Sequence, residues 1–354
     1  MKNLNISTDL KNNDLKKMMA QKLLTSPNAI SLFSDSTAVV VELFKYFYKP
    51  YCNIITAGHV TPETVIAADH AEINIIESIP QSPFSSNVTA VLKNVKNSFD
   101  IIYVSNPNRF TGSNYSLADL REFANNIPQG LLIIDEYYHE YFGISGLPLL
   151  ELFTNVIIMR SFTASFGINS SDAGYMIADP TFISKFEEFD NLKKISPIIE
   201  KTIRAVMLND DALTMRLKEI HEESLRLCTA LNKLGVSSRI MATDSILIRV
   251  ASPKDVGNFL TSSKISIENL DGYPRLQNYI RYRIESPLSN DRLIKAFEKM
   301  PPNYFKMKSK DRYAVTLRRS SEVAETDDSR LTDAMIDKIV SGRKKEKVLT
   351  LVED

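Results

Sequence analysis

Residues 160–167 read Arg160-Ser161-Phe162-Thr163-Ala164-Ser165-Phe166-Gly167, and they follow directly on an apolar run at 155–159. Similar runs lie upstream at 53–56, 73–76, 100–104 and 131–134. These runs are continuous rather than alternating, which is typical of strands covered on both faces of a parallel sheet. Helical spacing at 116–127, with Ser116 as a candidate N-cap, indicates one of the covering helices.

Polar side chains stand where three of these predicted strands end: Asn106, Asp135 and Arg160. In open α/β sheets, ligands bind beyond the carboxyl ends of the parallel strands. We therefore expect the candidate site at that edge of the sheet.

The composition is that of an ordinary globular protein, and it argues against several classes of protein: nucleic-acid-binding, membrane-spanning, secreted, and disulfide- or metal-stabilised. The 43 basic and 43 acidic side chains cancel, which leaves no electrostatic footprint for nucleic acid. No apolar run approaches the roughly 20 residues that span a bilayer, and residues 1–17 lack the apolar core of a signal peptide. Cys52 and Cys228 suffice for neither a disulfide framework nor a metal cluster. We expect a cytoplasmic protein without a nucleic-acid, metal or membrane site.

At 354 residues, the chain is long enough for two domains. We predict an N-terminal arm at 1–25, a large α/β domain at 26–208, a linking helix with a small α+β domain at 209–300, and a charged, partly flexible tail at 301–354. In the small domain, the pattern favours strands at 245–250 and 279–284 and helices at 253–262 and 289–300. In the tail, the predicted amphipathic helix at 330–340 is a candidate site for a protein partner.

The segment from Arg160 to Gly167, with Gly174-Tyr175 after it, resembles the active-site segment of the fold-type I aminotransferases. These are pyridoxal-phosphate (PLP) enzymes, and the similarity is strongest to the histidinol-phosphate aminotransferase branch, with its R-T-F-S-K-A-F-G and G-L-x-G-x-R-x-G-Y patterns. The resemblance covers about residues 25 to 300 and rests on four motifs in the family's order. It implies a PLP-transferase-like large domain with a mostly parallel sheet, a smaller C-terminal domain, and a homodimer with its active sites at the dimer interface.

Several family contacts are retained. Asp135 and Tyr138, in a D-E-x-Y motif, would face the pyridine nitrogen and the phenolic oxygen of the cofactor. Arg281 matches the clamp for a substrate carboxylate. The alternatives are a strand-end cap for Asp135 and a surface arginine for Arg281. Hydroxyl groups that match the phosphate cup and the N-P-N-N-P-T-G motif belong to Ser34, Ser36, Thr37, Thr111 and Thr163.

Other family contacts are replaced. Ala164 stands at the position of the lysine that carries PLP as a Schiff base, and no other lysine lies between Lys96 and Lys185. Asp172 stands where an arginine grips the cofactor phosphate, and Arg109 where an asparagine donates to the phenolic oxygen. A carboxylate repels a phosphate dianion that an arginine would bind. The resemblance thus implies PLP, while these residues replace its usual contacts.

Three functional hypotheses follow. In the first, the chain is an aminotransferase-like protein that does not transaminate and acts as a ligand-binding or partner subunit for an amino-acid-like or phosphorylated small molecule. In the second, the chain is a noncanonical enzyme of a biosynthetic pathway that catalyses a different reaction in the aminotransferase pocket. In the third, the chain is a lysine-to-alanine variant of an active PLP aminotransferase. Only the third hypothesis predicts that Ala164→Lys alone restores formation of the aldimine with PLP. Under the first two, little or none is expected, because Asp172 would still repel the cofactor phosphate.

Overall fold

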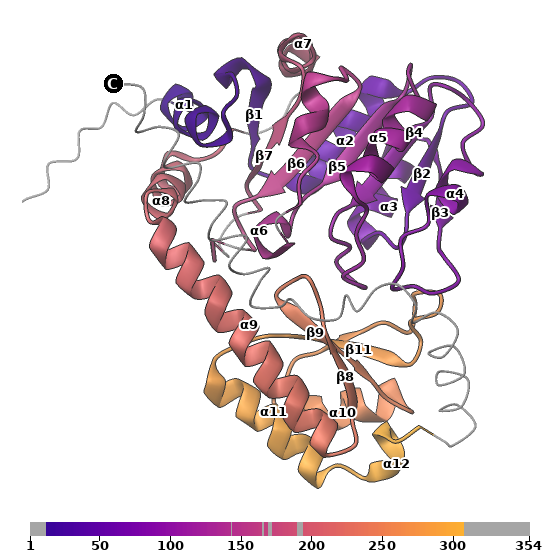
Figure 1. Cartoon of the computed structure of the whole chain (residues 1–354), viewed down its shortest axis with the longest axis vertical. Coiled ribbons are helices and arrows are strands. Elements are labelled where there is room, and N and C mark those ends of the chain that lie inside the picture. Colours follow the sequence, from indigo (N-terminus) through magenta and orange to yellow (C-terminus); the bar gives the residue numbers. More distant parts are fainter. Residues whose placement is uncertain (1–11, 143, 165, 169–171, 190–193, 308–354) are drawn as a thin grey trace, which may run out of the picture. The chain divides into compact units, whose positions relative to one another are not determined.

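The structure is a computed structural model that describes residues 12–142, 144–164, 166–168, 172–189 and 194–307 of the chain. These residues form two compact units, which divide between Leu213 and Thr214 (Figure 1). The helix predicted at 330–340 and nearly all of the predicted tail lie outside the described residues. Each unit is described by itself.

The first unit is built on a seven-stranded sheet in the order β1-β7-β6-β5-β4-β2-β3. Its strands are β1 (Ile30–Phe33), β2 (Asn53–Ala57), β3 (Asn74–Ser78), β4 (Ile101–Ser105), β5 (Leu131–Asp135), β6 (Val156–Ser161) and β7 (Gly174–Ile177). The β3-β2-β4-β5-β6 pairs are parallel, while β7 runs antiparallel to both β6 and β1. The mostly parallel α/β fold predicted from the sequence is confirmed.

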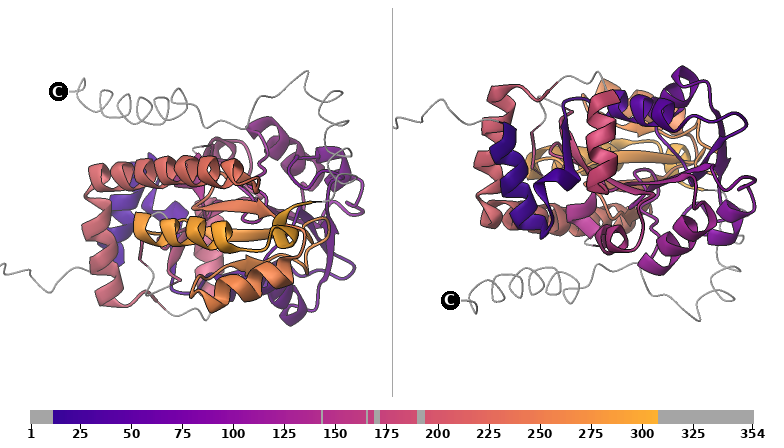
Figure 2. Two further views of the ribbon diagram at one scale, coloured as in Figure 1. Left: turned by 90° about the horizontal axis from the view of Figure 1, so that it is seen from below. Right: turned by 90° about the horizontal axis from the view of Figure 1, so that it is seen from above.

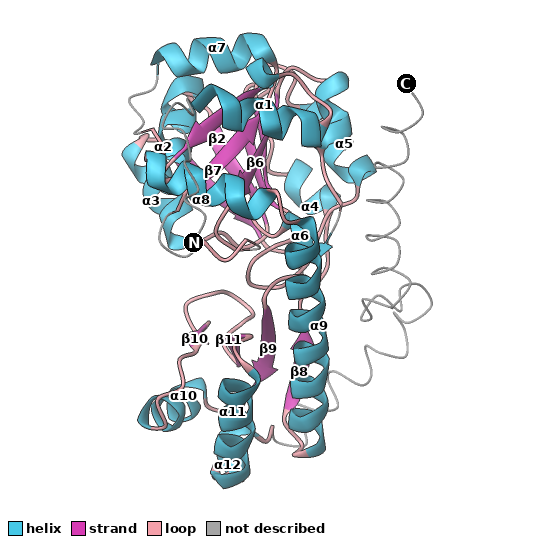
Figure 3. Ribbon diagram, turned by 90° about the vertical axis from the view of Figure 1, so that its left-hand side faces the viewer, coloured by secondary structure: helices cyan, strands magenta, loops and turns pink. Residues whose placement is uncertain are grey.

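Helices cover both faces of this sheet (Figure 3). One face packs against α2 (Ser36–Phe47), α3 (Pro62–His70) and α7 (Pro180–Phe189). The other packs against α1 (Asn12–Leu23), α4 (Val88–Leu92), α5 (Leu117–Asn126) and α8 (Pro197–Met207). Along β4, Ile101 and Tyr103 belong to the first core and Ile102 and Val104 to the second. Because successive strand residues point to opposite faces, a strand buried on both faces is apolar throughout.

Short elements complete the unit. They are the 3-10 turns η1 (Pro27–Ala29) and η2 (Leu147–Glu151) and the helix α6 (His139–Phe142). Ser116 caps α5 as predicted, since its hydroxyl accepts from the Asp119 N–H and the Asp119 carboxylate accepts from the Ser116 N–H. This reciprocal capping box fixes the start of the helix.

The second unit has a four-stranded antiparallel sheet, in the order β10-β11-β9-β8. Its strands are β8 (Ser237–Ile240), β9 (Ser245–Arg249), β10 (Glu268–Asn269) and β11 (Tyr279–Arg283). The helix α9 (Asp210–Lys233) runs into this unit from the first, and α10 (Pro253–Ser262) and α11 (Pro287–Lys299) follow. The three helices lie in a row over one face of the sheet and share its core (Figure 2). This is the α+β arrangement expected from the sequence.

Packing in the second unit continues past Met300, where the sequence suggests that the tail begins. The short helix α12 (Pro302–Phe305) places Phe305 in the core, with its ring centroid 5.8 Å from that of Phe297. The Ser252 N–H donates to the Tyr304 carbonyl at 2.8 Å. The packed body therefore extends to at least Phe305. The two prolines at 301 and 302 begin the helical turn that carries Phe305 into the core.

The described residues contain no helix with the length and apolar character needed to cross a membrane. In the same part of the chain, no group of three or more His, Cys, Asp or Glu side chains is arranged to hold a metal ion.

Candidate functional site

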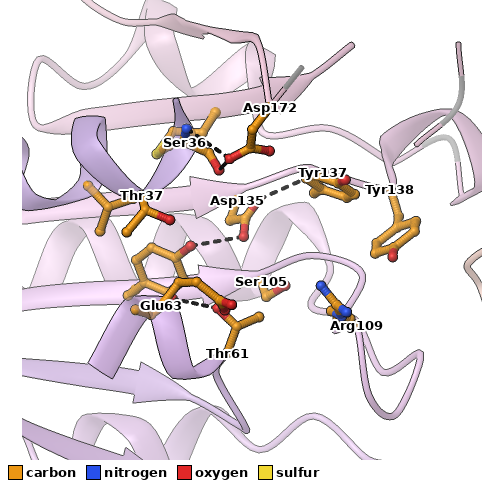
Figure 4. A pocket seen from close by; sticks show the side chains of 14 residues that line it. Ser36, Thr37, Thr61, Glu63, Ser105, Arg109, Asp135, Tyr137, Tyr138 and Asp172 are labelled. Carbon is orange, nitrogen blue, oxygen red and sulfur yellow. Dashed lines mark hydrogen bonds between the residues drawn. The ribbon is translucent and has the colours of Figure 1, made fainter. Parts of the chain in front are cut away.

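A cavity of about 310 Å³ lies in the first unit, where β4 and β5 end and where α2 and α3 begin (Figure 4). This is the edge of the sheet at which the sequence places a ligand. The residues proposed from the sequence that line it are Ser36, Thr37, Arg109, Asp135, Tyr138 and Asp172. The remaining polar lining was not predicted and comprises Thr61, Glu63, Thr64, Tyr103, Ser105 and Tyr137.

Asp135, the last residue of β5, lines this cavity. Its carboxylate accepts from the Tyr103 hydroxyl at 2.9 Å and from the Tyr137 N–H at 3.1 Å. The second bond is the strand-end cap considered as an alternative, so Asp135 both caps the turn and lines the cavity. Burial, with smaller contributions from the Asp172 and Glu136 carboxylates, raises the pKa of Asp135 to about 6, and these two hydrogen bonds partly offset the rise.

The raised pKa of Asp135 predicts a specific pH dependence of stability. An ordinary Asp carboxyl has a pKa near 3.8, so between about pH 4 and 6 the folded protein holds this proton and the unfolded chain does not. Below about pH 4 the Asp135 carboxyl is protonated in both states, so its burial has no effect on stability through ionisation. Above about pH 6 it is ionised in both states, and its burial then lowers the free energy of unfolding by up to about 3 kcal/mol. Relative to the unsubstituted protein, Asp135→Asn is expected to gain free energy of unfolding by up to that amount between pH 4 and 7. Urea unfolding across this range measures the difference, and a flat difference would contradict the assignment.

Asp172 lies two residues before β7 and binds the start of α2. Its carboxylate accepts from the Ser36 hydroxyl and, at 3.1 Å, from the Ser36 N–H. Asp35 caps the same helix, with its carboxylate accepting from the Ala38 N–H at 2.9 Å. Two of the first three N–H groups of α2 therefore donate to carboxylates of the chain itself. Asp172 and Ser36, both proposed from the sequence as ligand contacts, contact each other.

Arg160 does not reach the cavity and belongs to a buried ion pair. Its Nε donates to Glu136 at 2.8 Å, its Nη2 donates to the Ser145 hydroxyl at 2.8 Å, and Nη2 also lies 2.8 Å from the Glu136 carboxylate, with side chains 5% and 0% exposed. The Glu136 carboxylate also accepts from the Ser145 hydroxyl and the Gly146 N–H, and the His139 Nδ1 lies 3.7 Å away. Burial alone would lower the pKa of Arg160, but the Glu136 carboxylate raises it well above its ordinary value. Arg160 was expected at this edge of the sheet, but it is not among the described residues that line the cavity, because its guanidinium pairs with Glu136.

The other strand-end residue, Asn106, is also buried away from the cavity. Its side-chain oxygen accepts from the Tyr115 N–H at 2.8 Å and its amide donates to the Tyr115 carbonyl at 3.3 Å. Thr111 is likewise held within this loop, where its hydroxyl contacts Asn108 at 3.2 Å and Ser113 at 2.8 Å. These bonds shape the loop that presents Arg109 to the cavity.

Three more proposed residues lie outside the cavity lining: Ser34, Thr163 and Ala164. Ala164 is buried, and its carbonyl accepts from the Tyr141 hydroxyl at 3.3 Å. The Thr163 N–H donates to the Ser161 hydroxyl at 2.9 Å. The segment thus keeps its backbone packed, while no lysine is among the described lining residues.

Arg281, the proposed carboxylate clamp, lies on β11 in the second unit. It is buried there, so the alternative of a surface arginine is wrong. Its guanidinium donates to Glu268 at 2.8 Å and to Asp244 at 3.0 Å. Two carboxylates of the chain therefore already neutralise this arginine.

Glu63 is the most consequential lining residue that the sequence analysis missed. It lies in the first turn of α3, after Thr61 at the N-cap and Pro62 at the first helical position. A threonine, a proline and an acidic residue in this order are a signature of a helix start. That signature was available in the sequence, but the position of α3 beside the cavity depends on the crossover from β2.

A mostly parallel sheet with helices on both faces, a cavity at its carboxyl edge and a smaller α+β unit after a long helix define the PLP-transferase-like fold. Residues 1–268 match the Aminotransferase class I and II family, and the chain belongs to this family. Among curated relatives, the histidinol-phosphate aminotransferase of Christiangramia forsetii is 24% identical over 301 residues, covering 84% of this chain and 86% of that protein.

Solved structures show the same fold. The histidinol-phosphate aminotransferase of Sinorhizobium meliloti in complex with pyridoxal-5'-phosphate superposes with a TM-score of 0.72 at 19% identity, covering 82% of each chain. The enzyme of the same name from Clostridium acetobutylicum superposes with a TM-score of 0.73 at 19% identity, covering 84% of this chain and 90% of that one. The resemblance inferred from the sequence motifs is thereby confirmed at the level of family and fold.

Proposed function

We propose that this chain is an aminotransferase-family protein that binds a small molecule in the described cavity but does not transfer amino groups. The observation that carries the proposal is the bond from Ser36 to the carboxylate of Asp172. By the family match, Ser36 belongs to the phosphate cup and Ala164 stands at the lysine position. Homodimerisation, a cytoplasmic location and a protein partner for the tail are part of the same proposal and rest on the sequence resemblance.

PLP, the group bound in the Sinorhizobium meliloti structure, does not fit the residues present in this cavity. Its phosphate is a dianion that needs backbone N–H groups, hydroxyl groups and a cation. At the start of α2, the Ser36 and Ala38 N–H groups donate to Asp172 and Asp35. The position matched to the phosphate-binding arginine thus supplies a competing anion, and Ala164 supplies no amine.

The second unit supports the same conclusion. In the family, the arginine matched by Arg281 clamps a substrate carboxylate. Here Glu268 and Asp244 hold that guanidinium within the unit. A substrate carboxylate would have to displace two charge-assisted hydrogen bonds before binding.

An enzyme with redirected chemistry is the second candidate, and one observation favours it. A cavity carboxyl with a pKa of about 6, as at Asp135, suits a general acid or base near neutral pH. In that case Asp135 would move the proton, with the Tyr103 hydroxyl as its fixed hydrogen-bond partner.

An amino-transfer assay tests the proposal. The full chain is incubated with added PLP, histidinol phosphate or an amino acid as donor, and a 2-oxo acid as acceptor. We expect no turnover above buffer, and none for Ala164→Lys, because the repulsion by Asp172 remains. Turnover by the unsubstituted chain would refute the proposal. Turnover by Ala164→Lys alone would instead support the hypothesis of an altered active aminotransferase.

A further inference from the structure

The start of α2 carries a concentrated positive potential that a ligand or the chain must balance. The helix has 12 residues, and Ser36 and Thr37 of its first turn line the cavity. Aligned peptide dipoles place about half a positive charge at such a terminus. Asp35 and Asp172 supply two negative charges there, with their carboxylates bonded to the Ala38 and Ser36 N–H groups.

We infer that Asp172 acts as a built-in anion that sets the ligand class of the cavity, which accepts small organic amines and rejects phosphorylated compounds. This inference rests on the proposed function and deepens it by naming the ligand. Asp172 lies 136 positions from Ser36 in the chain, so the contact comes from the tertiary fold and is no local cap. A phosphate entering from the cavity would meet this carboxylate in place of the N–H and hydroxyl of Ser36.

The rest of the lining favours a cationic ligand. Glu63, Asp135 and Asp172 supply three carboxylates, and Arg109 is the opposing charge among the described lining residues (Figure 4). Arg109 lies below Asp135 in that view, away from Asp172, and its guanidinium carbon is 5.8 Å from the centroid of the Phe110 ring. An ammonium group near Asp135 and Asp172 would be attracted by both carboxylates.

Aromatic side chains supply a second feature that suits an amine. Tyr103, Tyr137 and Tyr138 all line the cavity. Phenol rings attract ammonium groups through their negative faces and also cover apolar carbon. At about 310 Å³, the cavity falls at the small end of the range for small-molecule sites. Together these features point to an aromatic or short aliphatic amine.

The first test measures whether the Asp172 carboxylate occupies a site that would otherwise bind an anion. Inorganic phosphate is titrated calorimetrically into the full chain, Asp172→Asn and Asp172→Ala. We expect both variants to bind phosphate at least about tenfold more tightly than the unsubstituted chain. Asp69→Asn is the matched control, since it makes the same change in net charge at an exposed position of α3. Equal phosphate affinity in all four folded proteins would overturn the inference, and Asp172→Asn keeps an acceptor for Ser36 if Asp172→Ala does not fold.

The second test uses pyridoxine, pyridoxamine and pyridoxamine 5′-phosphate, which differ stepwise by an amine and a phosphate. The unsubstituted chain is expected to bind pyridoxamine about tenfold more tightly than the other two. Asp172→Asn is expected to lose the discrimination against the phosphate. Tighter binding of pyridoxamine 5′-phosphate than of pyridoxamine would overturn the inference. So would no binding of pyridoxamine at up to about 10 mM. Amino transfer is assayed separately, so a chain that prefers pyridoxamine yet transaminates would refute only the proposed function.

Discussion

Replacing Arg160 by methionine is expected to lower the free energy of unfolding by about 3–5 kcal/mol. The guanidinium donates through Nε to Glu136 at 2.8 Å and forms an ion pair with it through Nη2, also at 2.8 Å, and the Glu136 side chain is fully buried. Without Arg160, that carboxylate keeps the Ser145 hydroxyl, the Gly146 N–H and the His139 ring at 3.7 Å, and it loses its buried guanidinium partner in a low-dielectric environment. Urea unfolding, followed by far-UV circular dichroism, measures the loss.

The double variant Arg160→Met with Glu136→Gln is the control for this prediction. Glutamine keeps an acceptor for Gly146 and removes the uncompensated charge, so the double variant should cost less than Arg160→Met alone. If Arg160→Met changes stability by less than about 1 kcal/mol, the pair does not have the energetic role assigned to it.

Introducing lysine at 164 together with arginine at 172 is expected to strengthen PLP binding at least about 100-fold over Ala164→Lys alone. Asp172→Arg removes a carboxylate from Ser36 and replaces it with a guanidinium, a change of two unit charges beside a phosphate dianion. At an effective dielectric constant near 20–40, this difference is worth several kcal/mol. Spectrophotometric titration followed by desalting measures the bound cofactor.

Ala164→Lys combined with Asp69→Arg is the matched control. It makes the same change in net charge at an exposed position of α3 outside the cavity lining. Its PLP affinity should equal that of Ala164→Lys. Equal affinity of both double variants would show that Asp172 does not control the phosphate seat.

The strands of the first unit that can be predicted from the sequence are those with a continuous apolar run, such as β4 to β6. Strand β1 pairs with β7 across more than 140 positions, from Ile30 to Ile177, and each has only four residues. Runs of that length carry no clear period. Helix α1 falls in the predicted N-terminal arm, yet Leu15 and Met19, four positions apart, are fully buried. Its interspersed charged residues dilute the helical pattern.

The candidate site shows the same division. The position of Asp135 at the end of an apolar strand makes it predictable, and so does its place at the sheet edge. The charge inversion at Asp172 is also visible in the sequence, but the destination of its carboxylate is not. The bond to Ser36 depends on the antiparallel turn of β7 beside β6 and β1. Arg160 and Asn106 also stand at the ends of apolar strands, as Asp135 does. Their side chains do not line the cavity, because Arg160 bonds to the buried Glu136 and Asn106 to the Tyr115 backbone, and the sequence pattern does not reveal these partners.

Equilibrium dialysis of the full, unsubstituted chain against PLP tests the central claim most directly. The claim is that Asp172 occupies the phosphate-binding site of this aminotransferase-family chain, and that the chain no longer binds the cofactor. We expect free exchange, with a dissociation constant in the millimolar range or weaker and no absorbance retained after desalting. One PLP retained per chain at micromolar concentrations would contradict it.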